Sequence, residues 1–141
     1  PYNIYGPRDH YGSQSGHVIA SLVWRAVRGE DPLLVWGDGT PTRSFLYVED
    51  AARGLLDVAE RYAVADPLNL GSDDEISIGD LARMILRLCG AKARLAWDKT
   101  KPSGQLRRSC DARKVVEKIG FKPSVSLEEG LRRSIEWLRK Q

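Results

Sequence analysis

Two arginines and a histidine carry the clearest chemical signal in this sequence. Arg43 follows a turn that contains Gly37 and Gly39, in the stretch VWGDGTPTRSFLYVED. A glycine-rich turn leaves backbone N–H groups open, and a guanidinium offers a planar fork of five donors that fits phosphate oxygens. The pattern is typical of an anion site. Considered alone, however, a solvent-facing arginine after an ordinary turn is the better explanation of Arg43.

His17 and Arg25 lie in the segment SGHVIASLVWRAVRG, which has helical periodicity. Because these residues are eight positions apart, they lie about 80° apart around a helix axis and can border one cleft. The imidazolium form of a histidine at a helix N-terminus is disfavoured, which suits a group that gives up a proton. A histidine that only caps the helix is the simpler alternative, and without further context it is preferred.

The elements that position these side chains follow from periodicity and turn residues. A helix is predicted from about 16 to 28, with Gly29 as its stop. The β-rich runs PLLVWG and RSFLYV flank DGTPT, which predicts a hairpin or a strand–turn–strand. A second helix is predicted to begin after Glu49 and Asp50, whose charges favour a helix N-terminus, and PLNLGS is predicted to be a short strand.

Three more helices are predicted in the C-terminal half, together with a strand at ARLAW and a long loop at 98–108. Their start and stop signals are, in chain order, Ser77 with Asp80 and Gly90, Asp111 with Gly120, and Ser126 with Glu129. The result is a mixed α/β chain of about five helices with few, separated strands. Such strands make a poor self-sufficient parallel sheet, so the chain is predicted to be one lobe of a larger protein.

The bulk composition narrows the possible classes of protein. A length of 141 residues fits one domain, and the absence of an initiator Met suggests a piece of a longer chain. The formal net charge is +3 with acidic and basic residues interleaved, which argues against a nucleic-acid partner, and no apolar run reaches the length of a membrane span. Cys89 and Cys110 lie in no metal-ligand spacing, so packed, reduced thiols, no metal site and a cytoplasmic location are expected.

Six segments along residues 1–141 form an ordered set: NIYGPRD, SGHVIASL, VWGDGTPTRSFLYVEDAARGL, NLGS, SIGDLA and KPSGQLRRSCDARKV. Together they resemble the C-terminal half of extended short-chain dehydrogenases that act on nucleotide sugars, the NAD-dependent epimerase/dehydratase family. The pattern WGxGTxxRxF followed by VxD is shared by many epimerases and dehydratases of this family, whereas HVI and KPxGxxR are closer to its GDP-L-fucose synthases. The resemblance implies an α/β fold: the substrate-binding C-terminal lobe of an extended Rossmann-type enzyme.

The resemblance also implies roles for individual residues. Asn3 matches the asparagine of the N-x-Y-G-P turn, beside the sugar and the diphosphate, and His17 matches the acid of the epimerisation of a 4-keto sugar. Arg25 and Arg43 match arginines that contact the substrate diphosphate. The other matches to substrate-binding residues are Leu22 and Trp36, in the pocket wall, and Lys101, near the nucleotide end.

Two motifs of the family's N-terminal half are absent from this sequence. No tyrosine is followed four residues later by lysine, and no glycines have the G-x-x-G-x-x-G spacing. The cysteine base of the epimerisation would also lie upstream. The resemblance therefore implies that the full-length enzyme uses NAD or NADP, that this chain supplies no cofactor-binding residues, and that it is inactive alone. It also places residues 47–72 against the missing N-terminal cofactor domain.

Other functions stay open at this point. The chain could come from a UDP- or dTDP-sugar 4-epimerase or 4,6-dehydratase, in which case His17 is structural. It could also be a non-catalytic module that binds a sugar nucleotide, or a structural remnant that forms a homodimer. The nucleotide base, the sugar, and the choice between NAD and NADP are not determined by these residues.

Overall fold

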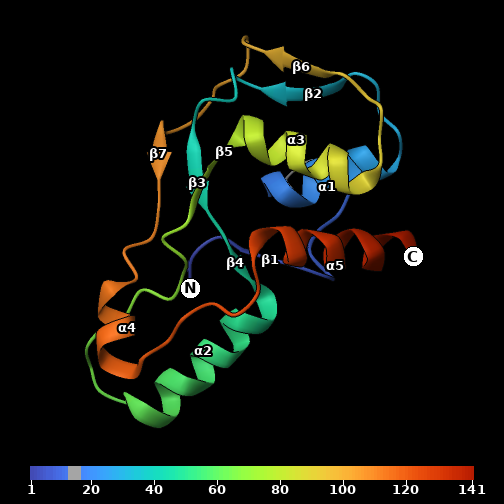
Figure 1. Cartoon of the computed structure of the whole chain (residues 1–141). Helices are drawn as coiled ribbons and strands as arrows, with labels where there is room; N and C mark the ends of the chain where they lie inside the picture. The colour runs from blue at the N-terminus through green and yellow to red at the C-terminus, as the bar shows by residue number, and fades with distance from the viewer. Residues whose placement is uncertain (13–16) are drawn as a thin grey trace.

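The computed structural model describes residues 1–12 and 17–141 (Figure 1). Within these ranges five helices and seven short strands are described, which confirms the predicted α/β class and number of helices. In chain order they are β1 (Ile4–Tyr5), α1 (Val18–Val27), β2 (Leu33–Trp36), β3 (Thr42–Ser44), β4 (Leu46–Tyr47), α2 (Val48–Arg61), β5 (Glu75–Ser77), α3 (Ile78–Cys89), β6 (Leu95–Asp98), β7 (Arg107–Arg108), α4 (Arg113–Ile119) and α5 (Leu127–Arg139).

The main core lies between three helices, α1, α3 and α5, which pack against one another beside the two-stranded sheet of β2 and β6 (Figure 1). Strand β2 alternates strictly: Leu33 and Val35 face the core, while Leu34 and Trp36 face outward. Each fully buried side chain of leucine or valine size contributes roughly 1.5–3 kcal/mol to stability. The outward face of β2 remains available for a site.

The predicted hairpin between the second and third strands is wrong, and the strand–turn–strand alternative is correct. Strand β2 pairs in parallel with β6, in a register that begins at Leu33 with Leu95. Strand β3 pairs antiparallel with β5 and parallel with β7. The chain turns away from a hairpin because the N–H of Gly37 donates to the carbonyl of Asp98 at 2.9 Å, which extends the β2–β6 pairing beyond the end of β2.

A smaller second core connects α2 with α4 and is formed by Leu46, Ala51, Leu70, Ala112, Val115 and Phe121. Strands β1 and β4 lie above it as a parallel pair. The predicted strand PLNLGS is wrong: the structure describes residues 67–72 as irregular, although the N–H of Tyr2 donates to the carbonyl of Leu70 at 2.9 Å. One such bond does not make a strand ladder.

The two predicted capping boxes begin helices as expected. The N–H of Asp80 donates to Oγ of Ser77 at 3.0 Å, and the N–H of Glu129 donates to Oγ of Ser126 at 3.2 Å. These bonds satisfy backbone donors that the first helical turn leaves free. The predicted stops Gly90 and Gly120 are confirmed as left-handed caps, with φ of 62° and 68°.

The remaining predicted helix ends are close to the observed ones. The predicted start near residue 16 lies outside the described residues, and Gly29, with φ of 72°, follows the end of α1. The cap of α4 is Ala112 rather than Asp111, because Ala112 is the residue that immediately precedes the helix. Oδ1 of Asp111 still accepts the N–H of Arg113 at 3.1 Å, so the aspartate stabilises the same helix start.

We expect Ser126→Ala to lower the free energy of unfolding by about 1 kcal/mol, because the N–H of Glu129 loses its side-chain acceptor. Ser126→Gly should cost only a few tenths of a kcal/mol, since glycine also tolerates the cap position. Urea denaturation followed by circular dichroism measures both changes. Equal losses in the two variants would contradict the role of the Ser126 hydroxyl.

Both cysteines are free thiols, as expected. Cys89 is half-buried at the end of α3, whereas Cys110 is buried just beyond β7. Burial raises the pKa of both thiols.

Among the described residues, none of the helices is long and apolar enough to cross a membrane, and no group of three or more His, Cys, Asp or Glu side chains could hold a metal ion.

Candidate functional site

The side of the molecule formed by α1, β2 and β3 carries an open hollow of about 350 Å³, here called the arginine hollow. Helix α1 contributes the predicted site residues Leu22 and Arg25, strand β2 contributes Trp36, and strand β3 contributes Arg43. Residues from five segments of the described chain therefore meet here; the other two are α3, through Ile78, and the loop containing Pro102 and Ser103. The two arginines predicted to act together do lie around one space.

A second hollow of about 430 Å³, here called the histidine hollow, is bordered by the predicted residues Asn3, His17 and Arg43. Because Arg43 and Val18 line both hollows, the two adjoin. The prediction that His17 and Arg25 border one cleft is thus only partly met. They line neighbouring hollows, because His17 is the N-terminal cap of α1 and Arg25 lies in the last turn of the same helix.

Both hollows are electropositive at their borders. Arg25 and Arg43 line the first, and Arg43 and Arg108 line the second, while no Asp or Glu is found among the described lining residues of either. Arg25 is paired with Glu30 outside the lining, whereas Arg43 and Arg108 appear in none of the described ion pairs. Arginines attract anions and offer several N–H donors to phosphate oxygens. The arrangement suits a ligand with more than one negative oxygen.

Arg25 is held in place by a neighbouring carboxylate. Its Nε donates to Oε2 of Glu30 at 2.7 Å, and its Nη2 donates to the other carboxylate oxygen. These hydrogen bonds hold the pKa of Glu30 below its usual value, so the pair stays charged at neutral pH. Side-on pairing leaves the outer N–H groups of the guanidinium free to bind an anion.

Arg43 braces the loop that closes the arginine hollow. Its Nη1 donates to the carbonyl oxygens of Thr42 at 2.7 Å and Gln105 at 2.8 Å. A Cβ placed on Gly104 would lie 3.3 Å from Nη2, so a glycine lets the loop approach the guanidinium closely. Arg43 therefore has both a structural and a ligand-facing part, and the remaining nitrogens can contact a bound molecule.

The glycine turn before Arg43 is not the open phosphate cradle that the sequence suggested. The N–H of Gly37 already donates to Asp98, and the N–H of Thr40 donates to Oδ1 of Asp38 at 3.0 Å. Gly37 and Gly39 both have φ of 80°, which a side chain would strain, and this explains the glycines without a ligand. The turn positions Arg43 instead of binding phosphate through these donors.

Trp36 lines the arginine hollow, and Lys101 lies beside Trp36. The Trp36 side chain is 59% exposed, and Nζ of Lys101 lies 5.9 Å from the centre of its ring. An exposed indole face beside a cation suits a flat, anionic ligand. Lys101 itself lines neither hollow, whereas Leu22 is buried and forms part of the floor.

His17 stands at the cap of α1, with no hydrogen bond from its side chain to the helix. The side chain is 77% exposed, and its Nδ1 lies 3.7 Å from Oδ1 of Asp9. Nearby, Nδ2 of Asn3 donates to the carbonyl of Ser44 at 2.9 Å. Burial raises the pKa of Tyr5, which lines the same hollow, so its phenol stays protonated at neutral pH and cannot act as a base.

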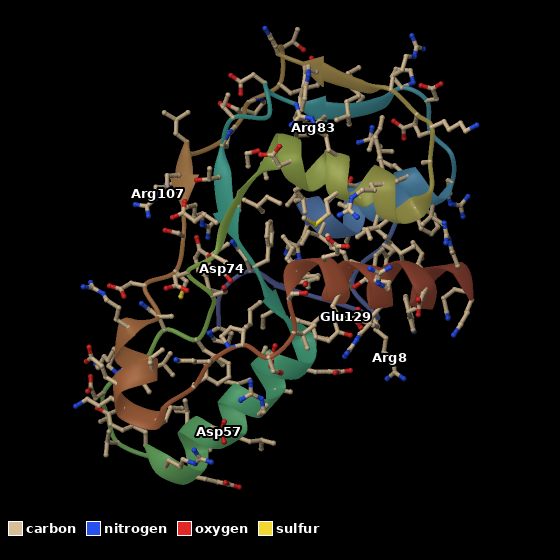
Figure 2. All side chains as sticks on the ribbon, in the orientation of Figure 1. Arg8, Asp57, Asp74, Arg83, Arg107 and Glu129 are labelled. Carbon is tan, nitrogen blue, oxygen red and sulfur yellow. The ribbon has the colours of Figure 1, made fainter. Side chains whose placement is uncertain are left out.

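The strand that carries Arg43 is fixed from both sides. Oγ1 of Thr42 donates to Oε2 of Glu75 on β5 at 2.8 Å, and Nε of Arg107 on β7 donates to Oε1 of the same carboxylate at 2.9 Å. Hydrogen bonds, first from Arg107 and then from Thr42, lower the pKa of Glu75 to about 2. Figure 2 shows Arg107 on β7, at the outer edge of this sheet. Glu75 thus joins all three strands.

Several residues around the hollows were not singled out by sequence reasoning. Ser103 and Arg108 lie in or beside the motif KPSGQLRR, so the motif was a usable signal for them. Asp9 ends the motif NIYGPRD, so this motif was a usable signal for it, whereas Glu30 gave no signal because it follows Arg25 by five residues across a helix end. Neither contact follows from a helical spacing rule.

Comparison with known proteins shows which protein family the chain resembles in sequence. The sequence model described as the NAD dependent epimerase/dehydratase family matches residues 1–71. The chain is 36% identical to GDP-L-fucose synthase 1 of Arabidopsis thaliana, covering 99% of this chain and 44% of that protein. It is 39% identical to the GDP-L-fucose synthase of Sinorhizobium fredii, over 96% of this chain and 44% of the relative. The chain therefore spans less than half the length of these relatives.

Solved structures agree with the fold. A GDP-L-fucose synthetase from Naegleria fowleri bound to NADP superposes with a TM-score of 0.92 at 28% identity, covering 98% of this chain and 44% of that one. A UDP-glucose 4-epimerase from Thermotoga maritima with UDP-glucose superposes with a TM-score of 0.88 at 31% identity, covering 99% and 44%. The chain thus corresponds to less than half of these larger Rossmann-type enzymes.

Proposed function

The chain belongs to the NAD dependent epimerase/dehydratase family, and we propose that residues 1–141 are the nucleotide-sugar-binding portion of an NAD(P)-dependent nucleotide-sugar epimerase/reductase of the GDP-L-fucose synthase type. One observation carries the proposal. Arg25 and Arg43 border a single carboxylate-free hollow, and Arg43 joins it to the hollow that His17 borders. A diphosphate and a sugar could occupy these two spaces side by side.

In this proposal the diphosphate lies between the two arginines. The outer N–H groups of Arg25 and the free nitrogens of Arg43 donate to its oxygens, and hydrogen bonds between charged groups are about twice as strong as neutral ones. The nucleoside lies toward Trp36, whose exposed ring can stack on a base, with Lys101 near the nucleotide end. The sugar then points toward Asn3 and His17.

The chemistry proposed for His17 is proton transfer to a carbon beside a ketone. A base outside this chain removes a proton from that carbon, which leaves an enolate, and the His17 imidazolium returns a proton to the opposite face. The proton on the carbon is replaced, the configuration inverts, and His17 is left neutral. The exposed position of His17 at the border of its hollow gives it access to a ligand there.

NAD(P) would supply hydride exchange in the complete enzyme. None of the helices described within 17–141 begins in a turn with G-x-x-G-x-x-G spacing, so these residues do not fit the phosphates of a dinucleotide. The residues that hold the cofactor and the catalytic base are therefore proposed to lie in the rest of the protein. The chain alone is accordingly expected to bind substrate but not to turn it over.

We also propose that residues 47–72 pack against that remaining part. Val48, Leu55 and Leu56 form an exposed apolar face on α2, and Val64 follows it. Isolated two-stranded parallel pairs such as β1 and β4 are unusual, because parallel sheets are normally larger and covered on both faces. Both features favour a covering domain, although a homodimer would cover the same face.

The runner-up is a UDP- or dTDP-sugar 4-epimerase or 4,6-dehydratase, which the likeness to the Thermotoga maritima UDP-glucose 4-epimerase favours. In that case His17 is structural, and His17→Ala in the complete enzyme should spare activity. A non-catalytic sugar-nucleotide module would share the binding site but lack the partner domain. These alternatives keep the diphosphate contacts. They differ in the nucleotide base that is bound and in whether and how the protein catalyses a reaction.

Isothermal titration of the 141-residue chain tests the binding site. We expect GDP or UDP to bind roughly 10- to 150-fold more tightly than the matching monophosphate, because the second phosphate gains charged hydrogen bonds worth about 1.5–3 kcal/mol. The variant Arg25→Ala should remove most of this difference. Arg61→Ala, on the far helix α2, is the matched control and should leave it unchanged.

A folded sample that binds diphosphates no better than monophosphates would contradict the proposed site. Among diphosphates, a preference for GDP supports the GDP-sugar assignment, whereas a preference for UDP or dTDP favours the runner-up. Size-exclusion chromatography of the same samples shows whether the chain forms a homodimer. If the chain is only a structural remnant, added nucleotide should not stabilise it.

A further inference from the structure

Asp9 is a carboxylate in an unusual setting near His17, which borders the histidine hollow. Its side chain is 11% exposed, and its Oδ1 accepts the N–H of His10 at 2.7 Å. Its other oxygen, Oδ2, is buried and accepts no hydrogen bond within the described part of the chain. An unsatisfied buried oxygen of a charged group is costly. The contact with His17 is made by the other oxygen, Oδ1.

The turn that presents Asp9 is also conformationally costly. Arg8 has φ of 69° and Asn3 has φ of 43°, so two residues with side chains adopt left-handed backbone conformations within one short segment. The N–H of Tyr11 donates to the carbonyl of Asp9 at 2.8 Å, which helps to hold the turn. Figure 2 shows the Arg8 side chain extending outward, whereas Asp9 is largely covered.

We propose that Asp9 is a positioning residue for His17: it accepts Nδ1–H of the imidazole and thereby leaves Nε2 facing the histidine hollow. Oδ1 of Asp9 lies 3.7 Å from Nδ1 of His17, and contacts of this kind often tighten when a ligand binds. The hydrogen bond made by one ring nitrogen decides which nitrogen carries the proton. The acid role of His17 rests on the proposed function, whereas the contact between Asp9 and His17 does not.

Other charged groups do not take over this contact. His10 lies on the same carboxylate, with its Nδ1 at 4.0 Å, but its side chain is largely exposed and does not line the hollow. Arg43 and Arg108 line the hollow but appear in no ion pair with Asp9. Among the described side chains, His17 is therefore the donor that borders the hollow and also lies near Asp9.

The test reads the tautomer of His17 directly. In the 141-residue chain carrying His10→Ala, His17 is the one remaining histidine, and its ring nitrogens are observed by ¹⁵N NMR at a pH where histidine is neutral. We expect the Nδ1–H form to be enriched, and Asp9→Ala to lower the ratio of Nδ1–H to Nε2–H about threefold, because the contact that is lost is with a charged acceptor but the His17 side chain is largely exposed to solvent. Asp9→Asn, which keeps the shape, should lower the ratio by less.

Asp38→Asn is the matched control, because this exposed carboxylate caps Thr40 in the turn after β2 and should leave the tautomer unchanged. An unchanged ratio in both Asp9 variants overturns the proposal, and if Asp9→Ala does not fold, Asp9→Asn decides alone. The measurement needs no nucleotide. A missing diphosphate preference in titration would therefore contradict the proposed function while leaving the result for Asp9 intact.

Discussion

Replacing Arg43 with alanine is expected to weaken the binding of GDP or UDP to the 141-residue chain by roughly 10- to 150-fold, because the change removes charged hydrogen bonds worth about 1.5–3 kcal/mol. Arg43 borders both hollows, so in the proposed function it contacts both the diphosphate and the part of the sugar next to it. Its Nη1 also braces Gln105, and part of the loss will come from the loop. Isothermal titration measures the change in affinity.

Arg43→Lys separates charge from geometry. Lysine keeps the positive charge but lacks the planar fork, so we expect it to recover only a small part of the lost affinity. Arg83→Ala is the control, since Arg83 on α3 pairs with Asp80 in solvent and lines neither hollow (Figure 2). Full recovery by lysine would indicate a simple point-charge contact, and an unchanged affinity in Arg43→Ala would remove the proposed diphosphate site.

Replacing Asp50 with alanine is expected to lower the free energy of unfolding by roughly 3–5 kcal/mol, because buried donors lose a charged partner. The Asp50 side chain is 1% exposed. It accepts the N–H of Ser124 and of Val125, both at 2.9 Å, and Nη2 of Arg53 at 2.7 Å. These bonds tie α2, which directly follows the strands β3 and β4, to the segment before α5. Urea denaturation measures the loss.

The same carboxylate makes stability depend on pH. Burial acts to raise the pKa of Asp50, but hydrogen bonds from Ser124, Arg53 and Val125 outweigh it and hold the pKa below its usual value. A depressed folded-state pKa stabilises the protein above the unfolded value, about 3.9, and this stabilisation is lost as the pH falls through the folded-state value.

Asp50→Asn should therefore flatten the acid limb of the stability curve measured by urea denaturation at several pH values. Asp74→Asn is the control, because Asp74 is an exposed aspartate in the loop before β5 (Figure 2). An acid limb that stays equally steep in Asp50→Asn would show that other carboxylates govern the acid response.

Local signals predicted most of the helices. Capping by Ser77 and Ser126 and termination at Gly90 and Gly120 depend on contacts within three or four residues, so the sequence determined these helix ends. The hairpin and the strand at 67–72 were wrong, because the partner of a strand is chosen at long range. Leu33 pairs with Leu95, and no local pattern encodes that distance.

The candidate site divides in the same way. The family resemblance predicted Asn3, Leu22, Arg25, Trp36 and Arg43 as substrate-binding residues, and the structure places them around two adjoining hollows. The motifs could not show that Lys101 lies beside Trp36 without lining either hollow, since its place depends on the course of the loop after β6. They also could not show that His17 and Arg25 border different spaces.

By itself the sequence determined the family pattern, the helices and the identity of the cationic residues, because these depend on residue types and short spacings. Only the tertiary structure decided which groups restrain them: Glu30 on Arg25, Gln105 on Arg43, and Asp9 beside His17. These pairs join a helix end, a strand and loops whose relative positions are set by packing of the cores. Their geometry exists only once the chain has folded.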